Sequence, residues 1–239
     1  MKIIIDSREK LASAAADQYA MLLAKKPDAV LGLATGSTPL DLYAELIRRC
    51  KAGKMTFKNA SSFNLDEYVG LAPTHEQSYR YFMEHNLFCG IDIPSERTHV
   101  PSGLDTDPEK LLGYDAEIEK AGGIDLQLLG IGHDGHIGFN EPGTPFESRT
   151  HTTPLTQITL EANKRFFNSI EEVPTSANTM GIRTVMNARA IILIALGKGK
   201  AEIIKKTLLG PVTTDVPASI LQLHPDVTVY LDEEAASLL

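Results

Sequence analysis

The stretch Ile124-Asp125-Leu126-Gln127-Leu128-Leu129-Gly130-Ile131-Gly132-His133-Asp134-Gly135-His136 joins an apolar run to a glycine-rich loop, which continues through Ile137-Gly138-Phe139-Asn140-Glu141. An apolar run that stops at glycines is typical of a buried parallel strand followed by a loop. Residues 130–141 carry two histidines, an aspartate, a glutamate and an asparagine. Titratable groups on such a loop are typical of an acid–base site. We therefore interpret residues 130–141 as the active-site loop of an enzyme.

Apolar runs and amphipathic stretches alternate along most of the chain. The predicted strands cover residues 2–6, 29–34, 61–65, 124–129, 190–196 and 227–231. The predicted helices cover residues 7–26, 40–50, 78–86, 107–121, 161–169 and 201–209, with Ser7 as the first N-cap. This alternation predicts an α/β fold with three layers, α/β/α, around a mainly parallel, Rossmann-like open sheet. We expect one domain over residues 1–239, with a mobile lid at about 150–180.

Composition excludes several classes of protein. The chain has 239 residues and a formal net charge of −8, which argues against a nucleic-acid partner. Its two cysteines, Cys50 and Cys89, lack the spacing of disulfide frameworks or zinc sites, as expected in a reducing compartment. The longest apolar segment, residues 190–196, is much shorter than the roughly 20 residues of a membrane span. We expect a soluble cytoplasmic protein without a membrane partner.

Polar clusters follow four of the predicted strands. They are Thr35-Gly36-Ser37-Thr38, Asp66, the 130–141 loop, and Lys198 with Lys200. The carboxyl ends of strands in an open parallel sheet lie along one edge, where ligands bind. A solvated surface loop would explain any one of these clusters, but four unrelated loops explain the whole set less well. The sequence therefore predicts that the clusters converge.

The segment Thr35-Gly36-Ser37-Thr38-Pro39 has the features of a phosphate site. It offers free backbone amides, hydroxyl groups and a helix N-terminus. It is not a Walker loop, because no Gly-Lys-[Ser/Thr] follows. The alternative is an ordinary N-cap by Ser37 or Thr38. Lys200 and Arg165 are candidate phosphate cations, although isolated basic residues usually lie on the solvated surface.

Two cofactor interpretations of the central loop are less favoured. Residues 130–135 match G-x-G-x-x-G, but Gly138, Pro142, Gly143 and Pro145 follow, so no helix N-terminus is available for a dinucleotide. The alternative of a metal site built from His133, His136, Asp134 and Glu141 matches none of the familiar ligand spacings. We expect neither a cofactor nor a metal.

Acid–base chemistry without a metal is the remaining interpretation. A histidine beside carboxylates is held in one tautomer and can move protons near neutral pH. Asp66 adds a carboxylate from another strand end, although a turn or N-cap role is the more common one for such an aspartate. Together with a phosphate site, these groups predict proton transfer on a phosphorylated sugar. Ring opening, enolisation and lactone hydrolysis all fit.

Three segments of the chain closely resemble the glucosamine-6-phosphate deaminase family. They are Phe63-Asn64-Leu65-Asp66-Glu67-Tyr68, the segment from Gly132 to Pro142, and Gly36-Ser37-Thr38-Pro39. The resemblance extends in order over nearly the whole chain. Supporting matches are Ser148-Arg149-Thr150, Arg165-Phe166-Phe167, Leu196-Gly197 with Lys200, and Leu221-Gln222-Leu223-His224-Pro225.

This resemblance implies the conversion of glucosamine 6-phosphate and water to fructose 6-phosphate and ammonia, a step in amino-sugar catabolism. By position, His136 would open the pyranose ring, with Asp134 and Glu141 orienting it. Asp66 would be the base that moves a proton from the amine-bearing carbon to its neighbour. Water would then hydrolyse the imine, so the enzyme would act as a hydrolase on a carbon–nitrogen bond.

The resemblance also assigns the binding residues. Ser37, Thr38, Arg165 and Lys200 would hold the phosphate beside Thr35 and Gly36, and residues 150–180 would form the lid. A base enclosed under such a lid is desolvated, which raises its pKa toward neutrality.

The chain differs from the allosteric members of the family in two places. It has His151, Thr153 and Pro154 where those members carry basic residues, and it ends at Leu239 without their C-terminal extension. We therefore expect a monomer or small homo-oligomer rather than the allosteric hexamer activated by N-acetylglucosamine 6-phosphate.

Two other functions compete with a deaminase. A 6-phosphogluconolactonase shares the fold and the phosphate site but needs no base at carbon 2, so Asp66 discriminates between the two. A non-catalytic sugar-phosphate sensor would require an attached DNA-binding segment, for which the chain has neither length nor basic charge.

Overall fold

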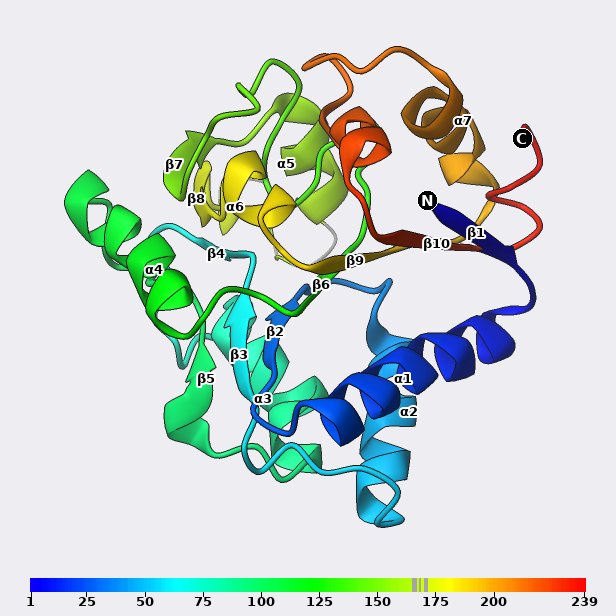
Figure 1. The fold of residues 1–239 in the computed structure, drawn as a ribbon. Coiled ribbons are helices and arrows are strands. Elements are labelled where there is room, and N and C mark those ends of the chain that lie inside the picture. Colours follow the sequence, from blue (N-terminus) through cyan, green and yellow to red (C-terminus); the bar gives the residue numbers. More distant parts are fainter. Residues whose placement is uncertain (165–166, 168, 170–171) are drawn as a thin grey trace.

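The fold is built on one parallel sheet of seven strands. The computed structural model describes residues 1–164, 167, 169 and 172–239. In spatial order the strands are β1 (Lys2–Ile5), β10 (Val227–Leu231), β9 (Ala190–Ala195), β6 (Leu126–Leu129), β2 (Val30–Leu33), β3 (Ser61–Asn64) and β5 (Thr98–His99) (Figure 1). Every neighbouring pair is parallel. The predicted open parallel sheet is confirmed, and β5 is an addition to it.

The order of the strands creates a crevice between β2 and β6. From β1 at one edge the chain crosses to β2 and proceeds outward to β3 and β5. It then returns to β6 and proceeds the other way, to β9 and β10. The loops after β2 and β6 therefore leave the sheet in opposite directions, and ligands bind at such points in open α/β sheets.

Helices cover both faces of this sheet, which confirms the predicted three layers. They are α1 (Arg8–Lys25), α2 (Leu40–Lys51), α3 (Tyr79–Asn86), α4 (Pro108–Lys120), α5 (Gln157–Asn163), α6 (Ile182–Met186) and α7 (Ala201–Leu209), with short 3-10 turns η1 (Phe88–Gly90), η2 (Ser95–Arg97), η5 (Lys198–Lys200) and η6 (Pro217–Leu223). Figure 1 shows α1 and α2 together on one face and α7 on the other. None of the helices described here is both long and apolar enough to span a membrane.

A second, antiparallel sheet is absent from the predictions. It contains β4 (Asp66–Tyr68), β8 (Ser176–Thr179) and β7 (His151–Pro154), in that order. These strands are short, and β7 and β8 are rich in polar residues, so they lack the apolar alternation that identifies a strand in sequence. Two of them lie in the segment 150–180, which therefore contains regular structure rather than a plain loop.

One predicted helix start is wrong, and one predicted capping hydrogen bond is absent. Helix α5 begins at Gln157 rather than at residue 161, because the Thr156 side chain accepts a hydrogen bond from Thr159 N and caps the helix there. The end of the predicted range 161–169 includes residues outside those described. Ser7 does occupy the N-cap position of α1, but its hydroxyl makes no capping hydrogen bond.

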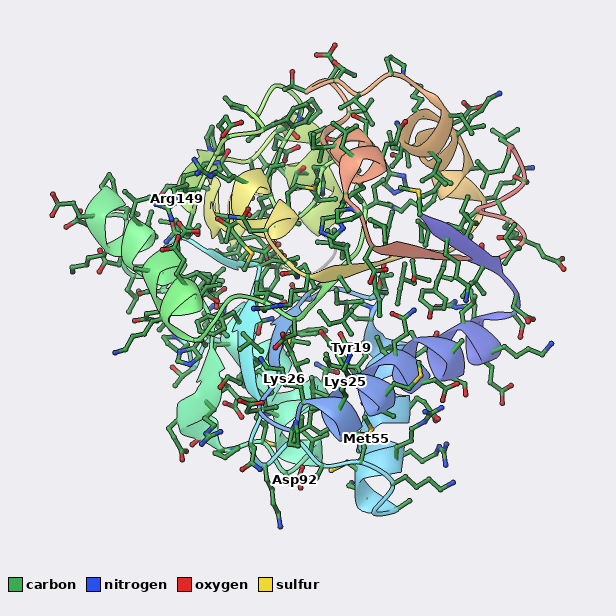
Figure 2. The ribbon with its side chains drawn as sticks, in the orientation of Figure 1. Tyr19, Lys25, Lys26, Met55, Asp92 and Arg149 are labelled. Atoms are coloured by element: carbon green, nitrogen blue, oxygen red, sulfur yellow. The ribbon has the colours of Figure 1, made fainter. Side chains whose placement is uncertain are left out.

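Among the described residues, four buried hydroxyl groups have no hydrogen-bond partner, and that of Tyr19 gives a test of the packing. Tyr19 lies on α1 with a side chain that is 0% exposed (Figure 2), and its hydroxyl has no hydrogen-bond partner among the described residues. Nearby Tyr43 is equally buried but donates to the Ala34 carbonyl at 2.5 Å.

We predict that Tyr19→Phe raises the free energy of unfolding by about 1 kcal/mol, because it removes a buried polar group that gains nothing from folding. Tyr43→Phe is the matched control and should lower the free energy of unfolding by about 1 kcal/mol. Urea unfolding of the two variants measures both changes. Equal destabilisation by both substitutions would contradict this description of the core.

Candidate active site

A cleft of about 940 Å³ opens at the carboxyl edge of the parallel sheet. Its walls include residues from all four predicted clusters: Thr35, Gly36, Ser37, Thr38, Asp66, Gly130, Ile131, Gly132, His133, His136, Gly138 and Lys200. Side chains that are up to 165 positions apart in sequence therefore meet in one cavity (35 to 200). The structure brings the clusters together as the strand-end argument predicts, while the role of each residue stays a prediction.

His136 stands in the cleft wall with two carboxylates at one ring nitrogen. Its Nδ1 lies 2.7 Å from Asp134 Oδ1 and 3.4 Å from Glu141 Oε2. Nδ1 has no hydrogen-bond partner among the described residues, so its contacts with the two carboxylates are ion pairs. Asp134 Oδ1 also accepts the backbone N–H of His136 at 3.2 Å, which fixes the turn. Because Nδ1 faces the carboxylates, Nε2 is the nitrogen left for chemistry.

Charge decides the protonation of this cluster. Burial by itself would lower the pKa of His136, but the contacts with Asp134 and Glu141 outweigh it and raise that pKa to about 9. Burial likewise opposes ionisation of Asp134, yet the neighbouring imidazole holds its pKa below the usual range. Near neutral pH, His136 is therefore an imidazolium paired with carboxylates, and it can act as an acid.

Asp66 is placed so that it can serve as a base. It is the first residue of β4, pairs with Thr179 in the ladder and is only 6% exposed. It is neither a turn nor an N-cap aspartate. Burial, together with the negative charge of Glu67, raises the pKa of Asp66 to about 7, although the charge of His136 opposes this. A carboxylate with this pKa is suited to proton abstraction near neutral pH.

An aromatic wall of Tyr68, Tyr79 and Phe139 forms one side of the cleft, and the sequence predictions missed it. The ring of Tyr68 lies 4.8 Å from that of Tyr79 and 5.6 Å from that of Phe139. Tyr79 and Phe139 also line the cleft. Glu67 positions Tyr79 by accepting the backbone N–H of Tyr79 and that of Arg80 at the start of α3. In sequence Tyr79 belongs to an ordinary helix pattern, so no local signal identifies it.

The segment after β2 forms the opposite end of the cleft. Gly36 has a φ of +89°, a left-handed conformation that favours glycine. Pro39, not Ser37 or Thr38, occupies the N-cap position of α2, so the alternative of an ordinary hydroxyl cap is wrong. Ser37 and Thr38 line the cleft near the N-terminus of α2. Hydroxyls and amides that are not used for capping are available to a phosphate.

Of the candidate cations, Lys200 is at the cleft. Its Nζ donates to the Ile131 carbonyl at 2.8 Å, which links the loop after β9 to the loop after β6. Lys198 does not line the cleft, and its backbone N–H donates to Glu234. Arg165 lies outside the described residues. Arg8, which the sequence predictions did not single out, also lines the cleft.

The four residues of the metal alternative do not converge as a set. Ligand atoms of Asp134, His136 and Glu141 lie within 4.8 Å of one another and could hold a cation. His133 is exposed, and its Nδ1 lies 3.3 Å from the carbonyl oxygen of Gly199 instead. The described residues thus offer three ligands, all of which are already arranged as an ion-paired acid.

Comparison with known proteins identifies the family of this chain. A family model described as glucosamine-6-phosphate isomerases/6-phosphogluconolactonase matches residues 6–230. The chain belongs to this family. It is 57% identical over 231 residues to the glucosamine-6-phosphate deaminase of Lachnoclostridium phytofermentans, which covers 96% of this chain and 98% of that protein.

Two further members of the family are similar over their full length. The glucosamine-6-phosphate deaminase of Thermoanaerobacter pseudethanolicus is 54% identical over 241 residues, covering 100% of this chain and 95% of that protein. A solved structure described as a monomeric glucosamine-6-phosphate deaminase superposes with a TM-score of 0.97 at 46% identity, and it covers 100% of both chains. The overall fold of the chain is thus that of a known family.

The packing of His136 gives a test that needs no substrate. A Cβ atom on Gly132 would lie 2.3 to 2.6 Å from three atoms of the imidazole ring. We predict that Gly132→Ala displaces the ring from its carboxylates, so that the pKa of His136 falls from about 9 toward its ordinary value, about 6.5. Histidine NMR titration measures this shift. Gly113→Ala on α4, where the new methyl group meets open space, is the control. An unchanged titration in Gly132→Ala would contradict the geometry.

Proposed function

We propose that this chain is a glucosamine-6-phosphate deaminase. It converts glucosamine 6-phosphate and water to fructose 6-phosphate and ammonia, as an enzyme of amino-sugar catabolism that hydrolyses a carbon–nitrogen bond. The observation that carries this proposal is the buried carboxylate of Asp66, with a pKa of about 7, in the same cleft as the cationic His136. The names of the relatives that are 54% and 57% identical support it.

The proposed reaction begins with binding and ring opening. The phosphate lies against the backbone and hydroxyls of Thr35, Gly36, Ser37 and Thr38, near the α2 N-terminus, with Lys200 as a cation. Arg165 is kept as a further phosphate residue on the basis of the sequence. Nε2 of His136 gives its proton to the ring oxygen while water takes the proton of the anomeric hydroxyl, so the bond between carbon 1 and the ring oxygen breaks and the pyranose opens. Asp134 and Glu141 hold the imidazole in place.

Isomerisation and hydrolysis follow in the proposed scheme. The Asp66 carboxylate takes the proton from carbon 2 while the substrate's ammonium group gives a proton to the aldehyde oxygen, which becomes a hydroxyl. Protonated Asp66 then gives its proton to carbon 1. Carbon 2 is then an imine, which water hydrolyses to the ketone with release of ammonia. These side chains, water and the substrate's ammonium group suffice for the proton transfers, so we propose that the reaction uses no metal or cofactor. The segment 150–180, which includes β7, α5 and β8, is proposed as the lid.

A 6-phosphogluconolactonase remains the main alternative, because the family description covers both activities. Hydrolysis of a lactone requires no base at carbon 2. The desolvated Asp66 behind an aromatic wall has no task in that reaction, and this favours the deaminase.

We further propose a monomer or small oligomer in the cytoplasm, without allosteric activation. A relative that is 46% identical is described as monomeric. The strand β7 carries His151, Thr153 and Pro154 at the positions where allosteric members would place basic residues. Both Cys50 and Cys89 are free thiols, which supports a reducing compartment.

The proposal predicts that the purified protein releases ammonia from glucosamine 6-phosphate. Asp66→Asn should lower kcat by about 100-fold or more with little change in KM, since it removes the base but leaves the phosphate site. Asp107→Asn is a matched control, because asparagine caps α4 as well as aspartate does. Treatment with EDTA should leave the rate unchanged.

Coupled assays of ammonia and fructose 6-phosphate measure these rates. If the protein hydrolyses 6-phosphogluconolactone and releases no ammonia, the proposed function is wrong. A rate that EDTA abolishes would overturn the metal-free scheme alone.

A further inference from the structure

The two carboxylate oxygens of Glu141 have different partners. Oε2 faces Nδ1 of His136 at 3.4 Å. Oε1 accepts a hydrogen bond of 2.6 Å from the hydroxyl of Thr159, which lies 18 residues further along the chain. Glu141 and Thr159 are 5% and 4% exposed, so this hydrogen bond is shielded from water. Thr159 also lines the substrate cleft.

Thr159 is held in place by the first turn of α5. Its backbone N–H donates to the Thr156 hydroxyl oxygen, which caps the helix. The Thr156 hydroxyl in turn donates to the Thr159 hydroxyl oxygen at 3.1 Å. With that oxygen already accepting a proton, the Thr159 hydroxyl hydrogen is directed to Glu141. A chain of hydrogen bonds therefore leads from the start of α5 to one oxygen of Glu141, and the other oxygen of Glu141 faces His136.

We propose that Thr159 is a positioning residue, which holds the Glu141 carboxylate directed at His136 and so makes the position of the ring-opening group depend on how helix α5 packs. Thr159 itself needs no contact with the reacting atoms. The part of this inference that concerns turnover rests on the proposed deaminase function.

Desolvation is the physical basis of this role. A buried imidazolium stays charged only where nearby counter-charges replace water. The charges that face His136 come from Asp134 and Glu141 on its own loop and from Asp66 on β4. Without the Thr159 hydroxyl, Oε1 of Glu141 keeps only the Thr156 backbone N–H, at 3.5 Å, among the described residues. The carboxylate can then turn away from Nδ1, and His136 loses one of its counter-charges. The pKa of His136 then falls.

Thr159→Val tests this inference, because valine keeps the shape of threonine and removes the hydroxyl. We expect the pKa of His136 to fall by about one unit or more, and kcat with glucosamine 6-phosphate to fall about tenfold with KM nearly unchanged. Thr159→Ser keeps the hydroxyl and should restore both quantities to within about twofold of the parent protein. NMR titration of labelled histidines and steady-state kinetics provide the two readouts.

A control on the same helix separates this role from general loosening of α5. Gln157 is exposed, and its side chain donates to Glu161 without touching the cleft. Gln157→Ala should change neither the His136 titration nor kcat. If Thr159→Val fails to fold, Thr159→Ala is measured in its place. An unshifted titration in the hydroxyl-free variant, or a loss in Thr159→Ser equal to that in Thr159→Val, overturns the inference.

The titration does not require turnover, so the two proposals can fail separately. A parent protein that releases no ammonia would overturn the deaminase function. The same protein with a His136 pKa that depends on the Thr159 hydroxyl would still show Thr159 as the positioning residue of the cluster.

Discussion

The removal of the Asp66 carboxyl group from water is the constraint on which the rest of the site depends. In water an aspartate has a pKa of about 3.9, which makes it a weak base for a proton bound to carbon. Burial at the start of β4 raises the pKa of Asp66 to about 7. The ladder with Thr179 and the aromatic wall of Tyr68, Tyr79 and Phe139 enclose it. The small antiparallel sheet thus places the proposed base at the cleft.

The loops at the carboxyl edge of the parallel sheet carry the proposed acid and the proposed phosphate site. Because the strand order reverses between β2 and β6, the loops after these strands leave a crevice between them. One loop carries Thr35 to Thr38 beside the N-terminus of α2, and the other carries His136 with its two carboxylates. Paired groups whose environments set different pKa values are the usual basis for assigning acid and base roles. Here the cation at His136 and the carboxyl group of Asp66 form such a pair.

The sequence predicts those elements whose residues form a recognisable run of apolar side chains. The buried strands β2, β6 and β9 are continuous apolar runs that end at polar loops, so both the parallel sheet and the convergence of the loops follow from the sequence. Strands β7 and β8 do not follow from it, because their short polar segments become strands only through pairing with each other and with β4. The same limit applies to side chains. Thr159 lies before the helix predicted at residues 161–169, and its bond to Glu141 depends on how α5 packs.

The most direct test of this account is the titration of Asp66 itself. Difference infrared spectroscopy between the parent protein and Asp66→Asn isolates the carboxyl stretching band of this one residue, without substrate. The account predicts that the protonated band of Asp66 disappears with a midpoint near pH 7, since its pKa is about 7. Asp66 would then be protonated below that pH and available as a base above it. A midpoint at the ordinary value of about 3.9 would show that the carboxyl group is hydrated, and would contradict the central claim.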